Sequence, residues 1–279
     1  MPTTPTSDHD SDDLSQAFYV RVMTRLKEAE IPFLVGGAFA LARFTGLERN
    51  TKDFDIFVRR EDIDRTLAAL ADDTCRTEMS FPHWLAKATC GDDFVDIIFS
   101  SGNAVAHVDD EWFQHAPEEM VLGLPAKLSP PEEMIWSKAF IMERERYDGA
   151  DVMHVILRCG DKLDWARLLR RFGEHWRVLF AHLILFNFIY PGEHTKIPVW
   201  VMEHLTARLQ RETREPLPNQ HICRGPLVSR AQYLIDIQLW GFKDARRGPN
   251  GFMTDDEVKL WTQAIHEPKA DPHFPDPLG

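Results

Sequence analysis

Residues 53–58, Asp-Phe-Asp-Ile-Phe-Val, begin with acidic side chains that alternate with apolar ones. In a β-strand, side chains two positions apart lie on the same face, about 6.5 Å apart. Asp53 and Asp55 would therefore project together, while the apolar residues between and after them point to the other face. Aspartate is disfavoured within strands, and two adjacent carboxylates repel each other. The stretch therefore predicts a strand whose acidic face needs a compensating cation.

Asp96 repeats this pattern in a second predicted strand. It is the only charged residue in residues 94–100, Phe-Val-Asp-Ile-Ile-Phe-Ser, and a buried carboxylate without a partner is costly. If this strand lies beside residues 53–58, three carboxylates converge on one place. Carboxylates are ligands of Mg²⁺, so such a place would hold one or two of these ions. Bound there, they would contact phosphate and lower the pKa of an attacking hydroxyl.

Gly36 and Gly37 follow a short apolar run, residues 31–35, and precede a helical pattern over residues 38–44. Two glycines between a strand and a helix expose backbone N–H groups at the helix N-terminus, where phosphate binds well. The turn therefore predicts a phosphate-binding position close to the Asp-x-Asp strand.

A Gly-Gly turn, an Asp-x-Asp strand and a carboxylate on a later strand together resemble the nucleotidyltransferase superfamily, the DNA-polymerase-beta-like fold. The resemblance covers roughly residues 31–100, and it is similar to the small bacterial branch of antibiotic and toxin–antitoxin nucleotidyltransferases. It implies an α+β fold, with a mixed sheet and flanking helices. The spacing between Gly37 and Asp53 is longer than in many members of the superfamily.

The resemblance also implies a reaction and its residues. Asp53 and Asp55 would hold Mg²⁺, and Asp96 would ligate one ion and activate the acceptor. The reaction would move a nucleoside monophosphate from an NTP to an acceptor hydroxyl with release of pyrophosphate. The alternative function is a non-catalytic nucleotide-binding or protein-interaction module, such as a toxin–antitoxin component.

A helix is predicted over residues 132–145, starting at Ser129-Pro130-Pro131-Glu132 with a serine N-cap and a proline in the first turn. Lys138 lies within its apolar stripe, so it should pair with carboxylates or with an anionic ligand. The same bacterial branch looks similar here, and the matching positions are Lys138, Arg144, Asp148 and Asp151. We expect Lys138 to contact the triphosphate, and the nucleotide-binding set to be Gly36, Gly37, Lys138, Arg49 and Lys52.

Each candidate residue also has a purely structural interpretation, which the sequence leaves open. Asp53 and Asp55 could be solvated residues of an edge strand, and Asp96 could pair with a lysine such as Lys138 without a metal. The glycines could form only a turn, and Lys138 could extend outward. The remaining charges could be a helix N-cap pair, Asp148 and Asp151, or solvated loop residues, Arg49 and Lys52.

The 279 residues are long enough for a substantial core, and the spacing of turns and helical patterns divides them into four parts. After the strands, the chain is expected to become mostly helical. The expected parts are an acidic disordered tail (1–13), a nucleotidyltransferase-like α/β domain (14–127), a helical domain (128–266) and a proline-rich tail (267–279).

The formal charge of −12 argues against nonspecific coating of nucleic acid, which depends on lysine and arginine. The charge is unevenly distributed, however: residues 1–157 carry −14 and residues 158–250 carry +6. We therefore expect a small-molecule acceptor first, and an RNA acceptor on region 158–250 second. The sequence does not decide whether the chain also has a protein partner.

The scattered cysteines and the absence of a signal-like N-terminus predict a cytoplasmic protein with reduced thiols. The most apolar run, residues 178–190, is shorter than the roughly 20 residues of a membrane span. It is therefore expected to form a buried helix, and no membrane contact is predicted.

Overall fold

The computed structural model describes residues 8–48, 53–215, 221–247 and 251–264. Its centre is a seven-stranded mixed sheet in the order β3-β4-β5-β2-β1-β7-β6. β2 runs parallel to β5, and β1 runs parallel to β7, while the other neighbours are antiparallel. The strands are β1 Leu34–Val35, β2 Phe54–Phe57, β3 Arg76–Phe81, β4 Leu85–Cys90, β5 Asp93–Ile98, β6 Glu118–Val121 and β7 Leu124–Leu128.

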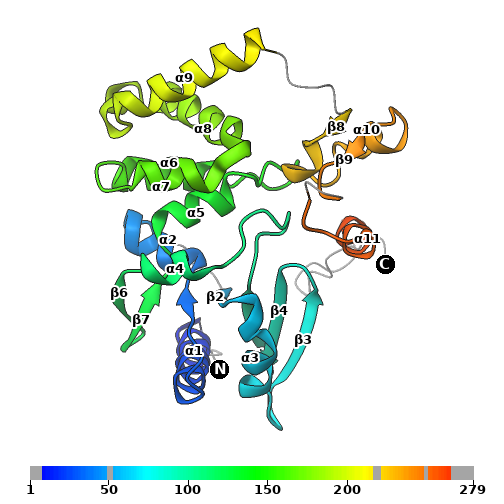
Figure 1. Cartoon of the computed structure of the whole chain (residues 1–279). Coiled ribbons are helices and arrows are strands. Elements are labelled where there is room, and N and C mark those ends of the chain that lie inside the picture. The colour runs from blue at the N-terminus through cyan, green and yellow to red at the C-terminus, as the bar shows by residue number, and fades with distance from the viewer. Residues whose placement is uncertain (1–7, 49–52, 216–220, 248–250, 265–279) are drawn as a thin grey trace, which may run out of the picture.

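Helices flank this sheet and form a layered group beyond it (Figure 1). The expected α+β class, with a mixed sheet and a mostly helical region after it, is confirmed. The helices are α1 Asp8–Glu28, α2 Gly37–Thr45, α3 Ile63–Leu70, α4 Asp110–Gln114, α5 Pro131–Lys138, α6 Gly149–Cys159, α7 Trp165–Phe172, α8 Trp176–Ile189, α9 Val199–Arg214, α10 Leu234–Gln238 and α11 Asp255–Gln263. A short parallel pair, β8 Ile222–Cys223 and β9 Lys243–Asp244, lies in the C-terminal part.

The alternation along β2 separates the core face of the sheet from its polar face. Phe54, Ile56 and Val58 are fully buried, and Tyr19 of α1 stacks on the Phe54 ring at 4.5 Å between centroids. Asp55 points to the other face. β2 lies between β5 and β1, so the interpretation of Asp55 as a solvated edge-strand residue is wrong, whereas Asp53 precedes the strand and is exposed.

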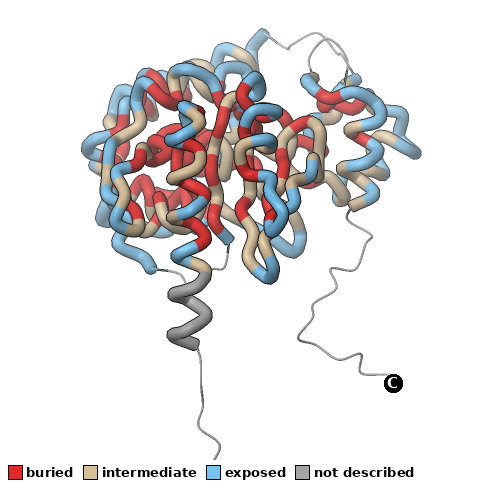
Figure 2. The backbone as a smooth tube through the Cα atoms, turned by 90° about the horizontal axis from the view of Figure 1, so that it is seen from below, coloured by how far each residue is buried: buried red, intermediate tan, exposed pale blue. Residues whose placement is uncertain are grey.

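One hydrophobic core runs through the sheet and the helices, as the buried segments in Figure 2 show. It includes Phe18 of α1, Leu205 of α9 and Ala245 beyond β9, so it spans both of the units expected on either side of residue 128. α1 begins at Asp8, within the segment expected to be a tail, and residues 267–279 lie outside the described residues.

The C-terminal part returns to the sheet. The Trp261 ring of α11 packs edge-on against Phe81 at the end of β3, with ring centroids 4.8 Å apart, and against Trp84 at 5.2 Å. Figure 1 shows α11 beside β3. The described parts of the C-terminal chain thus lie at the β3 side of the sheet, at the right in Figure 1.

α5 is shorter than the predicted helix, because it ends at Lys138. The chain after it is held away from helical geometry by a hydrogen bond from the Met142 N–H to the Val228 carbonyl, 3.0 Å long. The N-cap position is Pro130, without a side-chain cap. The Glu132 carboxylate instead accepts from the Asp164 N–H and pairs with Arg167, both at 2.6 Å.

The expectation that all the cysteines are reduced is wrong for two of them. Cys75 and Cys90 form a disulfide, with their Cα atoms 4.3 Å apart. Cys75 precedes β3 and Cys90 ends β4, so the hairpin brings them together at its open end. Cys159 and Cys223 are free.

Among the described helices, none is both long and apolar enough to cross a membrane. The apolar run predicted to be a buried helix forms α8, and only one side of it is covered. Leu183 and Phe186 are fully buried, whereas Phe188 is 81% exposed.

Candidate active site

The Gly36-Gly37 turn and Asp55 meet at one point. Gly37 adopts a left-handed conformation with φ +54°, and a Cβ atom there would lie 1.9 Å from the Asp55 Oδ2 atom. A Cβ atom at Gly36 would lie 2.0 Å from the Phe57 ring, and the Gly36 N–H donates to the Asp55 carbonyl at 2.9 Å. The two glycines are therefore required by the close approach of the α2 N-terminus to β2.

β5 places Asp96 directly beside Asp55. The two residues are partners in the parallel β2–β5 register, and Lys87 is the antiparallel partner of Asp96 on β4. The Lys87 Nζ atom lies 3.0 Å from Asp96 Oδ1. The interpretation of Asp96 as a salt-bridge residue is therefore correct in kind, although its partner is Lys87 and not Lys138.

This arrangement destabilises the ionised form of the Asp55 carboxylate. Burial, followed by repulsion from Asp96 and Asp53, raises the pKa of Asp55 from 3.8 to about 7. Burial also raises the pKa of Asp96, against the opposing effect of Lys87. Asp53 itself is exposed, just before β2. A cation at this position would relieve the repulsion.

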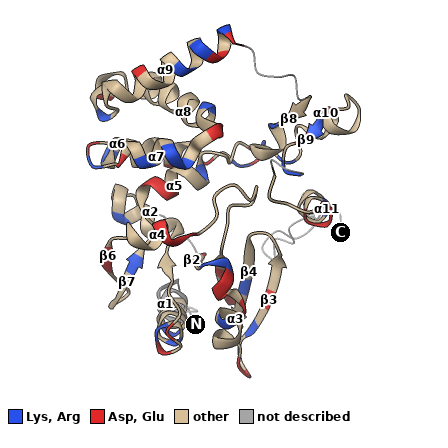
Figure 3. Cartoon of the chain, in the orientation of Figure 1, with Lys and Arg blue, Asp and Glu red and all other residues tan. Residues whose placement is uncertain are grey.

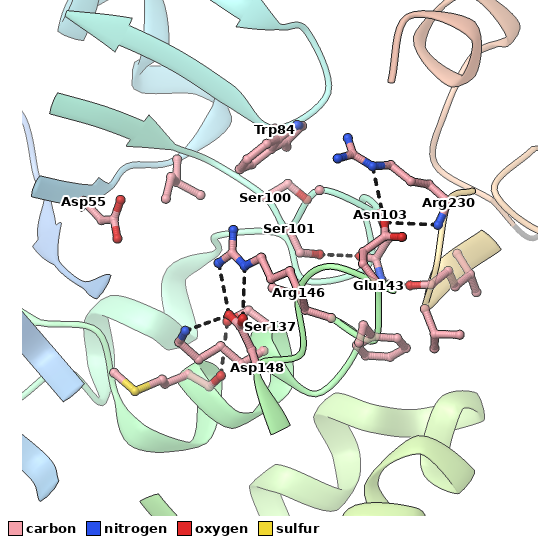
Figure 4. A pocket seen from close by; sticks show the side chains of 18 of the residues that line it. Asp55, Trp84, Ser100, Ser101, Asn103, Ser137, Glu143, Arg146, Asp148 and Arg230 are labelled. Atoms are coloured by element: carbon pink, nitrogen blue, oxygen red, sulfur yellow. Dashed lines mark hydrogen bonds and ion pairs between the residues drawn. The ribbon is translucent and has the colours of Figure 1, made fainter. Parts of the chain in front are cut away.

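Lys138 points inward, so the interpretation of Lys138 as an outward-extending side chain is wrong. Its Nζ atom lies 2.9 Å from Asp148 Oδ2 and 2.8 Å from Asp151 Oδ2. Asp148 stands at the N-cap position of α6 without capping it, because its carboxylate also accepts from Arg146 at 3.0 Å (Figure 4). The matching arginine of the pattern was expected at position 144, but Arg144 is exposed and pairs with Glu145.

These residues border a cavity of about 210 Å³. Gly37, Asp55, Lys138, Arg146 and Asp148 line one part of it. The rest of its wall is mostly apolar and is supplied by several stretches that are far apart in sequence. Those lining residues include Phe57, Trp84, Ser100, Trp112, Phe140, Ile141, Glu143, Leu227, Val228, Arg230 and Trp261.

Only some of the predicted site residues line the cavity. Gly37, Asp55 and Lys138 border the cavity, and Asp53 and Asp96 flank Asp55 at the sheet. Arg49 and Lys52 lie outside the described residues. Lys87 was not predicted as a site residue. It is the only charged residue in strand β4, as Asp96 is in residues 94–100, and this pattern could have identified it. Arg230 and Trp261 were not predicted either, because their position depends on the return of the C-terminal chain.

A metal would have to be held by few protein ligands. Within the ranges that the structure describes, no three histidine, cysteine, aspartate or glutamate residues are arranged to hold an ion. Mg²⁺ commonly uses one or two carboxylates together with waters and substrate phosphates. The raised pKa of Asp55 beside a second carboxylate fits that kind of site.

The positive charge of region 158–250 is largely used within the fold. Arg167, for example, is 2% exposed and pairs with Glu132 and Glu133 of α5, and Figure 3 shows acidic segments against this basic region. The basic side chains of the region with an ion pair are Arg167, Arg171, Arg177, Lys196, Arg208, Arg224, Arg230, Arg246 and Arg247. Nine of the fifteen basic side chains of this region thus have an acidic partner within the described residues.

No family model and no curated protein matches the chain. Among solved structures, it is similar to a solution structure of the antibiotic-resistance factor ANT(2'')-Ia, with 18% identity and a TM-score of 0.44, over 63% of this chain and 98% of that one. A crystal structure of ANT(2'')-Ia in complex with adenylyl-2''-tobramycin has 16% identity and a TM-score of 0.44, over 59% of this chain and 98% of that one.

The lincomycin-bound lincosamide antibiotic adenylyltransferase LnuA is also similar, with 13% identity and a TM-score of 0.36, over 50% of this chain and 94% of that one. Adenylyltransferases are nucleotidyltransferases, the superfamily that the sequence pattern resembles. Because the identities and TM-scores are low, the chemistry of this chain has to be read from its own side chains.

Proposed function

We propose that this protein is a nucleotidyltransferase that moves a nucleoside monophosphate from an NTP to an acceptor hydroxyl. The observation that supports this most is the meeting of Gly37 and Asp55 at the edge of the cavity. The N-terminus of α2 attracts phosphate through its backbone N–H groups and its dipole. The carboxylates beside it attract the cation that accompanies a triphosphate.

Asp53, Asp55 and Asp96 do not form a ready three-ligand cluster within the described residues. One or two of them, first of all Asp55 because it borders the cavity, are therefore the proposed ligands of Mg²⁺, together with water and phosphate oxygens. Bound Mg²⁺ would neutralise phosphate charge and lower the pKa of the attacking hydroxyl. In the transfer, the hydroxyl oxygen bonds to the α-phosphorus, the bond to the β-phosphate oxygen breaks, pyrophosphate leaves, and the hydroxyl proton is released to solvent.

Lys138 and Arg146 are the proposed contacts of the triphosphate. Both cations already contact the Asp148 carboxylate, which holds them in position before binding. A phosphate oxygen would then accept hydrogen bonds from the same two side chains. The chain contributes mostly by positioning and by charge neutralisation, as preorganised sites for phosphate chemistry do.

The test is release of pyrophosphate over a panel of NTPs and pooled hydroxyl acceptors with Mg²⁺. Asp55→Asn and Asp53→Asn should each lower the rate about 100-fold or more, the cost typical of a lost electrostatic contact in the transition state. Asp73→Asn, an exposed aspartate before β3, is the matched control and should retain the wild-type rate. Full activity in both site variants would refute the proposal.

Calorimetry with NTP and Mg²⁺ separates the alternative function. Binding without pyrophosphate release across all acceptors would favour a nucleotide-binding module, and absence of NTP binding would favour a protein-interaction module.

A further inference from the structure

The cavity has two ends of different chemistry. Asp55 lies at one end, and Arg230 and Glu143 lie at the other, as Figure 4 shows. Under the proposed function, the triphosphate occupies the end at Gly37 and Asp55. The acceptor then occupies the end bordered by the C-terminal wall, residues 226–230 and Trp261.

This wall is fixed to the rest of the site by hydrogen bonds. The Asn103 side-chain amide donates to the Leu227 carbonyl at 2.8 Å, and the Met142 N–H donates to the Val228 carbonyl at 3.0 Å. The Ser229 hydroxyl donates to Glu143 Oε2 at 2.8 Å. The acceptor end therefore has a preformed shape.

The charges at this end cancel. The Arg230 Nε atom lies 3.3 Å from Glu143 Oε1, and the backbone N–H of Arg230 donates to the same oxygen at 3.2 Å. The Arg230 guanidinium also stacks over the Trp261 ring at 3.9 Å. At this end, neither an ammonium group nor a carboxylate of a ligand would meet an unpaired opposite charge. Asp55, whose carboxylate is repelled by neighbouring aspartates, lies at the opposite end of the cavity.

Apolar surface fills the space between these paired charges. Trp84 and Trp261 pack edge to face at 5.2 Å, and Leu227, Val228 and Ile141 border the same cavity. Ser100, Ser101 and Asn103 add uncharged polar groups to this lining. Aromatic and aliphatic surface with uncharged polar groups favours an uncharged ligand with an apolar ring body.

We infer that the acceptor is an uncharged hydroxyl compound with an apolar ring body, and that the Glu143–Arg230 pair excludes charged acceptors. This inference deepens the proposed function and rests on it for the role of the ligand as acceptor. The chemistry of the cavity itself is independent of transfer, because it concerns binding alone.

The test measures binding of three probes of one shape to the full chain by calorimetry, without NTP, in wild type and in Asp55→Asn, so that the Asp55 carboxylate at the other end does not determine the result. The probes are 2-naphthalenemethanol, the 2-naphthylmethylammonium ion and 2-naphthoate. The alcohol should bind about tenfold or more tightly than either ion, because each ion would lose its hydration without gaining a partner. Tighter binding of either ion, or absence of binding by the alcohol, would overturn the inference.

Arg230→Gln tests the proposed cause of this selectivity. The variant leaves the Glu143 carboxylate without its guanidinium partner, so the ammonium probe should gain at least tenfold relative to the alcohol. Arg224→Gln is the matched control, because Arg224 pairs with the exposed Glu174 outside the cavity. An unchanged ratio in a folded Arg230→Gln protein would overturn the role of the ion pair, and the wild-type comparison stands without any variant.

Two further measurements separate the inference from the proposed function. Saturating ATP and Mg²⁺ should leave binding of the alcohol intact, and displacement of the alcohol by ATP would overturn its placement in the acceptor end. If the alcohol binds as expected but no NTP supports pyrophosphate release with any acceptor, the proposed function fails while the charge selectivity of the cavity holds.

Discussion

Replacing Asp55 with asparagine should stabilise the metal-free protein at alkaline pH. Burial and the neighbouring aspartates raise the pKa of this carboxyl to about 7 in the folded protein. The unfolded chain releases the same proton near pH 4. Between these values the folded state binds more protons, so the free energy of unfolding falls as the pH rises. Asparagine carries no such penalty.

The size of the effect follows from the shift in pKa. Each unit corresponds to about 1.4 kcal/mol, so a shift of roughly three units sets an upper limit of about 4 kcal/mol. Asp55 borders a cavity that admits water, which screens part of this energy, and we expect about 2 kcal/mol at pH 8. In a chain of this size that corresponds to an increase of about 4–8 °C in the melting temperature.

The assay is urea denaturation and thermal unfolding in EDTA at pH 5 and pH 8. Asp55→Asn should exceed wild type at pH 8 by a larger margin than at pH 5, while Asp73→Asn should follow wild type at both. Equal margins at the two pH values would refute the electrostatic explanation.

Mg²⁺ provides a second readout in the same assay. It should stabilise wild type at pH 8 and have little effect on Asp55→Asn. Equal stabilisation of both proteins would show that Asp55 is not part of the cation site.

Three further predictions concern the supports of the site. Gly37→Ala should lower the melting temperature more than Gly91→Ala. Both glycines have a positive φ, which costs an alanine about 1–2 kcal/mol, but only at Gly37 would the added Cβ also meet a neighbour, Asp55. Equal melting temperatures of the two variants would contradict the predicted clash. Lys138→Met should lower the free energy of unfolding by about 3 kcal/mol in urea, since Asp148 and Asp151 lose their shared partner, and Lys138→Arg should cost less. Cys75→Ser should lower the free energy of unfolding by about 3 kcal/mol under oxidising conditions, because the unfolded chain loses a cross-link that closes a loop of this length. Cys223→Ser is the control and should have no such effect. If reductant does not change the melting temperature of wild type, the disulfide does not stabilise the protein.

Parts of the site were predictable because the chemical anomaly lies within one short segment. Two aspartates among the apolar residues of a strand, and one in another strand, are costly wherever those strands lie. Lys87 carries the same signal in β4, but pairing it with Asp96 requires the β4–β5 register, which joins these positions across a turn. Arg144 was chosen from the resemblance to a bacterial sequence pattern, whereas the chain after α5 turns so that Arg146 reaches Asp148.

The alternation of β2 follows from the sequence alone, because side chains two apart in a strand share a face. The need for both glycines and the inward position of Lys138 depend on contacts with β2 and with Asp148 and Asp151, which the tertiary structure supplies. The place of the C-terminal part likewise depends on the tertiary structure. Arg167 and Arg171 pair with acidic residues from the first half of the chain. Arg230, which pairs with Glu143, and Trp261 border the same cavity as Asp55. Long-range contacts of this kind depend on how separate elements pack, which no local spacing encodes.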